Sequence, residues 1–155
     1  MRISLFLADY AQADDKGKIH AIGLTWVNVS TPLPPFAVVI VVDIDWSETN
    51  QPHQLTCELL NDDGQPVEVK GPVGEQPLRF GMRVEAGRPP GTSHGSVFRS
   101  ASAINVAGGL PLPPGRYQWR ATVDGYPDAT ATESFVVDSP PNPTAAGPAP
   151  TAGPA

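Results

Sequence analysis

Apolar and polar positions alternate with a period of two over most of this chain. In residues 36–46 the even-numbered positions, which form one phase of the strand, are all apolar. The odd-numbered positions form the other phase and are apolar through Val39 and Val41. Asp43 and Asp45 then make that second phase polar. A strand that is apolar on both faces is covered on both sides, so this segment is expected at the centre of a sheet.

Shorter alternating segments predict further strands along the chain. They lie at residues 3–7, 19–29, 54–59, 78–84, 98–106, 117–123 and 135–137. The turn sequence Asn-Asp-Asp-Gly at 61–64 suits a tight hairpin, because Asp-Gly tolerates positive φ. After this turn, Val67 and Val69 are expected to pair with Leu59 and Cys57.

The spacing of these segments predicts the fold class. Prolines separate the segments, and no stretch keeps a helical period over three turns. About eight or nine strands are expected, which is typical of an all-β, antiparallel, immunoglobulin-like β-sandwich, with a closed barrel as the alternative. Tyr117 follows Pro114 and Gly115, so its hydroxyl is expected to bond back to the preceding loop as a tyrosine corner.

Composition limits the chain to one domain with a tail. Its 155 residues suit a single folded unit, assigned to residues 1–137. Residues 138–155 are mostly Pro, Ala and Gly without an aliphatic or aromatic anchor, which predicts a disordered C-terminal tail. The apolar runs are too short for a spanning helix or a secretory leader, so a cytoplasmic protein without a membrane partner is expected.

Charge and candidate chemistry narrow the function classes. A net charge of −6 gives no long-range attraction to nucleic acid. The three histidines, His20, His53 and His94, lie in separate segments, and the single Cys57 lies on an apolar strand phase. No catalytic residue, cofactor site or transition-metal site is therefore predicted.

Acidic residues offer one alternative. Asp43 and Asp45 lie near the end of a predicted strand, and Asp62 and Asp63 lie in a predicted turn. Loop carboxylates of this kind can gather around calcium, which prefers six or more oxygen ligands. The competing interpretation is that aspartates in turns bond to their own backbone.

Arginines offer a candidate contact surface. Arg79 and Arg83 share the outward face of one predicted strand, and Arg116 and Arg120 share that of another. If these strands are neighbours, the four guanidinium groups form one patch for an anion or a partner. Solvated, scattered arginines are the alternative.

Several short motifs carry a resemblance to a family. They are Leu-Ala-Asp-Tyr-Ala at 7–11, Gly17-Lys18, Gly23, Trp26, Pro34, and the segments 59–64 and 114–119. With these, the chain resembles an uncharacterised, mainly actinobacterial family of β-rich proteins without an assigned function. The resemblance implies one small β-sandwich-like domain over about residues 1–137, and it brings no catalytic residue.

These observations predict a non-enzymatic binding module whose partner is another protein or a second copy of itself. The two-faced strand around Val39 and Val41 supports this, because a sheet face without cover would expose a large apolar patch. A small-ligand or calcium-binding domain using the acidic loops is the alternative. An enzyme of unfamiliar type is a third.

Overall fold

A computed structural model describes residues 1–71 and 74–139, so the tail predicted for 138–155 lies outside the described residues from position 140 onward. The described part is all-β apart from one short 3-10 helix. Its elements in order are β1 (Arg2–Ala8), β2 (Tyr10–Ala13), β3 (Ile19–Ile22), β4 (Asn28–Ser30), β5 (Phe36–Asp45), η1 (Trp46–Glu48), β6 (His53–Asn61), β7 (Glu68–Gly71), β8 (Gly74–Pro77), β9 (Arg79–Val84), β10 (Val97–Val106), β11 (Gly115–Val123) and β12 (Tyr126–Asp138).

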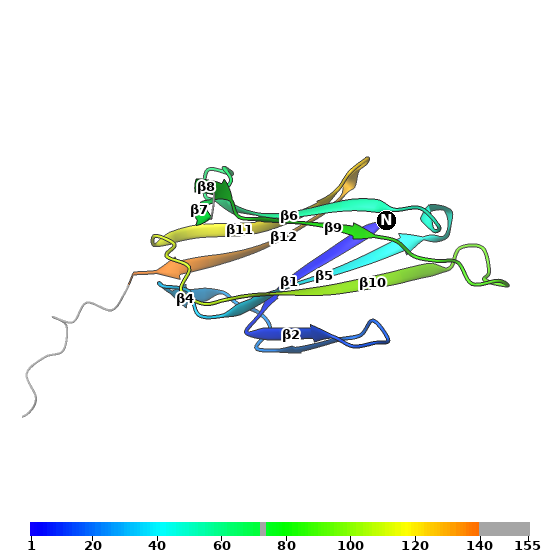
Figure 1. The fold of residues 1–155 in the computed structure, drawn as a ribbon, viewed down its shortest axis with the longest axis horizontal. Helices are drawn as coiled ribbons and strands as arrows, with labels where there is room; N and C mark the ends of the chain where they lie inside the picture. Colours follow the sequence, from blue (N-terminus) through cyan, green and yellow to red (C-terminus); the bar gives the residue numbers. More distant parts are fainter. Residues whose placement is uncertain (72–73, 140–155) are drawn as a thin grey trace, which may run out of the picture.

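Two larger sheets face each other across one hydrophobic core (Figure 1). The first has the strand order β1-β5-β10, and the second has the order β4-β12-β11-β6-β9 and is curled. All pairings within them are antiparallel except the short parallel contact of β12 with β4. The predicted all-β class is therefore confirmed.

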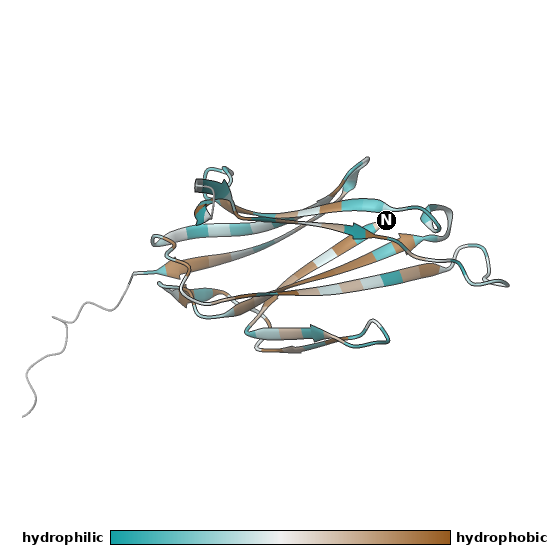
Figure 2. Cartoon of the chain, viewed as in Figure 1, coloured by the Kyte–Doolittle hydropathy of each residue, from teal (hydrophilic) through white to brown (hydrophobic). Residues whose placement is uncertain are grey.

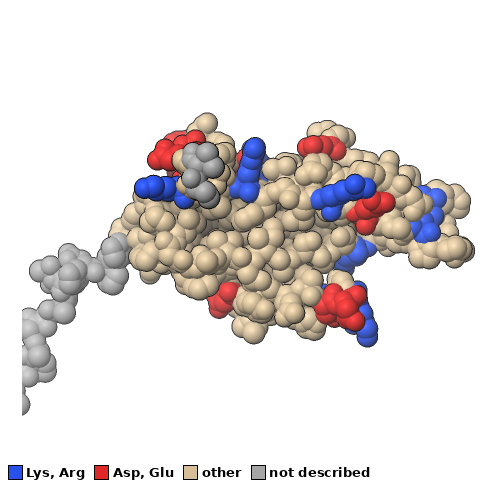
Figure 3. Space-filling model, viewed as in Figure 1, with Lys and Arg blue, Asp and Glu red and all other residues tan. Residues whose placement is uncertain are grey.

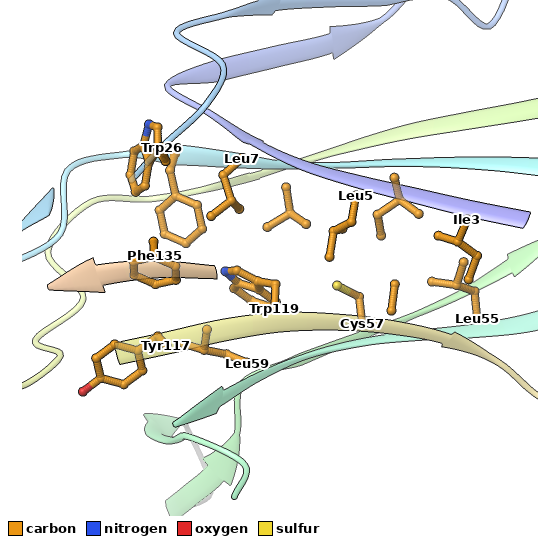
Figure 4. Close-up of a cluster of buried hydrophobic side chains, with 14 of the residues drawn as sticks. Ile3, Leu5, Leu7, Trp26, Leu55, Cys57, Leu59, Tyr117, Trp119 and Phe135 are labelled. Carbon is orange, nitrogen blue, oxygen red and sulfur yellow. The ribbon is translucent and has the colours of Figure 1, made fainter. Parts of the chain in front are cut away.

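The core is built from the facing phases of both sheets. Leu5 and Leu7 of β1 meet Cys57 of β6 and Trp119 of β11, all at most 5% exposed (Figure 4). Trp119 stacks on Phe80 of β9, with ring centroids 5.4 Å apart. Burying these side chains stabilises the fold by about 1.5–3 kcal/mol each relative to exposure.

A third layer covers the outer face of the three-stranded sheet. Strands β2 and β3 form a hairpin, called here the hairpin layer, which packs against β5 and β10 (Figure 1). Its Ala11 joins Ala8, Ala37 and Val39 in a second buried cluster, where small side chains let the layers approach closely. The Asn105 side chain of β10 receives a bond from the Ala11 N–H and donates one to the Ala11 carbonyl, at 3.3 and 2.8 Å.

The predicted position of the 36–46 strand is confirmed. Strand β5 lies between β1 and β10, with one phase in the main core and Ala37 and Val39 beneath the hairpin layer. Figure 2 shows the apolar stretches of β1 and β5 in the same sheet, and hydrophilic residues at the tip of the β2–β3 hairpin. The double cover explains why a ten-residue strand is apolar on both phases.

The predicted number of strands is wrong, because the described residues contain twelve. One extra strand arises where the strand expected at 19–29 divides into β3 and β4. Between them, Gly23 and Thr25 adopt φ values of +67° and +73°, which a continuous strand cannot contain.

The hairpin predicted after residues 61–64 is only half right. The turn forms, and the Val67 N–H bonds to the Leu59 carbonyl at 2.9 Å. Val69, however, pairs with Gln76 of β8, while Cys57 pairs with Phe80 of β9. Aromatic Phe80 covers the core beside Trp119, so β9 takes the place beside β6, while β7 and β8 pair as a separate two-stranded sheet.

The predicted bond of Tyr117 is confirmed. Its hydroxyl donates to the Pro113 carbonyl at 2.9 Å, and its ring is 8% exposed beside Phe135. The bond ties the start of β11 to the loop before it, as a tyrosine corner does.

Candidate functional site

The outer face of the three-stranded sheet carries an ion cluster at one end. Asp43 of β5 is 7% exposed, and Arg2 and Arg99 lie opposite it on β1 and β10. Arg2 Nη2 donates to Asp43 Oδ2 at 2.7 Å, and Arg99 Nε and Nη2 donate to the two carboxylate oxygens at 2.7 and 3.0 Å. These bonds lower the pKa of Asp43 from 3.8 to about 2, with Arg99 the larger cause and Arg2 the second.

Acid should therefore weaken the fold through Asp43. The folded-state pKa lies below the unfolded value of 3.8, so the stabilisation is present above pH 4 and is lost as the pH falls towards 2. We expect about 1–2 kcal/mol, because both guanidinium groups are well exposed and screened. In Asp43→Asn, urea unfolding measured between pH 5 and pH 2 should lose less stability than the wild type, and equal losses would contradict the assignment.

The structure does not bring the four candidate calcium ligands together. Asp45 lies at the end of β5, where its carboxylate accepts a bond from the N-terminal ammonium at 2.7 Å. Asp62 and Asp63 lie in the turn after β6, a strand that begins near the end of β5 and runs away from it. Within residues 1–71 and 74–139, no three His, Cys, Asp or Glu side chains gather as a metal site would require.

The four candidate arginines lie on two strands that β6 separates. Arg79 and Arg83 belong to β9, and Arg116 and Arg120 belong to β11. Glu58 of β6 lies in register with both Arg79 and Arg120, and its carboxylate accepts a 2.6 Å bond from Arg120. The Glu58 carboxylate therefore lies between the arginines of β9 and those of β11. In Figure 3 the Lys and Arg side chains, drawn in blue, lie apart, with red Asp and Glu side chains between some of them.

A cavity of about 330 Å³ opens on the outer face of the curled sheet. Its polar wall comes from Asn61, Asp62, Arg116, Gln118 and Ser134 at the end of the sheet where β6 turns. The cavity is therefore lined by a candidate calcium ligand, Asp62, and a candidate contact residue, Arg116, with Tyr117 beside them.

The loop between β9 and β10 is anchored at Trp46. The Arg88 guanidinium lies 3.5 Å from the Trp46 ring centre, and the His94 ring stacks on Trp46 at 3.9 Å. Arg88 also donates to the Trp46 carbonyl at 2.7 Å and to Thr49 Oγ1 at 2.9 Å. Trp46 thus holds a loop in place, although its alternation had predicted a core position.

The remaining candidate chemistry lies in separate places. His20 lies 3.3 Å from Asp14 on the hairpin layer, and His53 lies 2.8 Å from the Glu48 carbonyl. Cys57 is fully buried, and this burial raises the pKa of its thiol to about 12. A thiol in such a setting stays protonated and unreactive.

Exposed large hydrophobic side chains concentrate in the N-terminal part of the chain. Among residues 1–71 and 74–139 six are exposed, and five of these fall between positions 6 and 27: Phe6, Tyr10, Ile22, Leu24 and Val27, with Val97 the sixth. Tyr10 and Ile22 lie directly opposite each other on β2 and β3 and are 50% and 69% exposed. This pair was not predicted from the sequence, although the alternation of Tyr10 with the buried Ala11 was the available signal.

Val39 and Val41 differ in their cover. Val39 is 3% exposed beneath the hairpin layer, and Val41, two residues further along β5, is only half-buried. The chain itself therefore covers the part of this face around Val39.

The family of the chain follows from a comparison with family models. The model for a family of unknown function (DUF6941) matches residues 3–133, which run from β1 into β12. The chain belongs to DUF6941. The match spans both larger sheets and the hairpin layer, so Tyr10, Ile22 and Asp43 all lie in the DUF6941 region. The predicted membership in an uncharacterised family is confirmed to this extent.

DUF6941 membership brings no activity, and no curated protein matches the chain. Among the described residues, no helix is long and apolar enough to cross a membrane.

Proposed function

We propose that this protein is a non-enzymatic binding module that contacts a protein partner through the outer face of the hairpin layer. The observation that carries the proposal is the pair of large side chains, Tyr10 and Ile22, that lie opposite each other on β2 and β3 and are 50% and 69% exposed. Monomeric proteins expose isolated apolar residues, whereas a local concentration of them marks interaction sites.

The chemistry of the hairpin layer suits a protein partner. Tyr10 presents an aromatic ring with a hydroxyl, a side chain enriched at protein interfaces, and Ile22 adds an aliphatic surface beside it. In Figure 3 the charged side chains of this layer lie towards its ends, with uncharged surface between them. A net charge of −6 also argues against nucleic acid and anionic lipid as partners.

The test replaces the exposed pair. Tyr10→Ser/Ile22→Ser should fold normally, because both side chains face solvent, and should lose the partner. Each buried large side chain contributes about 1.5–3 kcal/mol, so the pair should weaken binding at least about tenfold. The partner is captured from lysate of the native host, purified, and its dissociation constant is measured with both proteins by calorimetry.

The matched control is Lys70→Ser/Glu75→Ser. These residues also form an exposed cross-strand pair on a two-stranded hairpin, and their replacement leaves the net charge unchanged. The control should bind as the wild type does. Equal dissociation constants for the wild type and the Tyr10→Ser/Ile22→Ser variant would overturn the proposal.

Three finer expectations belong to the same proposal. The Tyr117 corner supports an immunoglobulin-like form of the two facing sheets. The buried free Cys57 is consistent with a reducing, cytoplasmic location. The Pro- and Ala-rich end of the chain suits the actinobacterial range inferred for the family. The calcium alternative is disfavoured, since two arginines already occupy the Asp43 carboxylate.

A further inference from the structure

Strand β10 presents a long free edge. It pairs with β5 on one side along all ten residues, and in the described part of the chain no strand pairs with its other side. Its sequence, Val97–Val106, contains no Pro and no Gly, and Arg99 is its one charged residue. Edges of this kind are templates for pairing with another strand.

The other outer strands of the two large sheets carry features that discourage pairing. Strand β4 has three residues and is followed by three prolines. Strand β9 has six residues, among them Arg79 and Arg83. Strand β1, at the opposite end of its sheet from β10, packs beside β12 of the other sheet. Short length, charge, proline and cover are the usual means of blocking an edge.

The inward face of β10 is also incompletely covered. Phe98 and Ile104 point to the core side of the sheet, opposite the fully buried Ile44 and Val38 of β5, yet both remain half-buried. An additional strand beside β10 would cover them and would satisfy its free backbone groups.

We infer that β10 pairs antiparallel with β10 of a second copy of this chain, extending the three-stranded sheet to six strands across a two-fold axis at Ala101. A two-fold axis perpendicular to the sheet keeps the core faces of both copies on one side. In such a pair, every residue of β10 lies opposite a residue of the second copy that faces the same side of the sheet. The residue on the axis lies opposite the same residue of the second copy.

The register centred on Ala101 matches side chains by type. On the core face, Phe98 lies opposite Ile104 of the second copy, an aromatic and β-branched pair that stabilises antiparallel sheets. On the outer face, Arg99 lies opposite the small, uncharged Ala103 of the second copy, so no like charges meet. A register centred on Ser102 would instead place Ile104 opposite a serine, Ser100 of the second copy.

In the part of the chain that the structure describes, one exposed large hydrophobic residue lies outside positions 6–27, and the same register accounts for it. Val97, 56% exposed, lies opposite Asn105 of the second copy. Within each chain Asn105 bonds to Ala11 of the hairpin layer. Val97 of one copy would therefore be covered beside the hairpin layer of the second copy.

The test uses the position of Ala101 on the two-fold axis, where it lies opposite Ala101 of the second copy. The wild type should sediment at twice 16.3 kDa at tens of micromolar. Ala101→Glu and Ala101→Lys should each weaken the dimer at least about tenfold, because like charges then face each other directly. An equimolar mixture of the two variants should return to the dimer mass, since Glu then faces Lys.

Ala107→Glu is the matched control, because it adds the same charge just past the end of β10 at an exposed position and should leave the dimer intact. Melting temperatures confirm that each variant folds. A monomeric wild type at hundreds of micromolar, dimeric Ala101→Glu, or a mixture that stays monomeric would each overturn the inference. Tyr10→Ser/Ile22→Ser should lose the partner and keep the dimer, so this inference and the proposed function fail separately.

Discussion

Trp119→Ala is expected to lower the free energy of unfolding by about 3–5 kcal/mol, the range for removing a large aromatic side chain from a packed core. Trp119 is 0% exposed, and its ring stacks on Phe80 and lies 6.3 Å from Phe36 of the facing sheet. Removing it leaves a cavity between the two sheets that their strands cannot close without losing register. Urea unfolding followed by circular dichroism measures the change.

Trp46→Ala is the control for this prediction. Trp46 is only half-buried and contacts Arg88 and His94 rather than the core. A cation–π contact contributes about 0.5–2 kcal/mol, so this variant should lose far less stability than Trp119→Ala. Similar losses for the two variants would show that the core is not centred on Trp119.

Val39→Asp is expected to destabilise the protein by at least about 3 kcal/mol, because it places a carboxylate in a cluster of small apolar side chains without a partner. Val39 packs against Ala8, Ala11 and Ala37, and its exposure is 3%. The charge should force the hairpin layer away from β5. Thermal unfolding, together with proteolysis at the turn Asp14–Gly17, would report both effects.

Val41→Asp makes the same change two residues further along the same face. Val41 is half-buried, so the carboxylate introduced at this position can reach water. The free energy of unfolding should therefore fall by less than about 1 kcal/mol. A large loss at Val41 together with a small one at Val39 would contradict the cover assigned to the hairpin layer.

Features set by neighbouring residues could be predicted from the sequence. The two-phase apolar run of 36–46 identified β5 as a central strand, since only double burial tolerates such a run. The turn at 61–64 and the bond of Tyr117 to Pro113 also follow from local chemistry. Both depend on backbone preferences and contacts within a few residues.

Features that depend on which strands meet could not be predicted. Alternation shows that Arg79 and Arg120 point outward, but it does not show that Glu58 lies between them. It likewise did not identify residues 10–22 as the cover of Val39, because small side chains such as Ala11 give little periodic signal.

The amino-acid sequence alone determined that this chain is all-β, that β5 is covered on both faces, and that Cys57 is a core residue. Each of these follows from the two-residue period of a strand, which assigns every side chain to a face without reference to its neighbours. Only the tertiary structure decided what covers each face, how the charges pair and which strand edge stays free. Those outcomes depend on strand order and on register between segments that are distant in the sequence. Because all strands share the same two-residue period, that period is compatible with many different strand pairings.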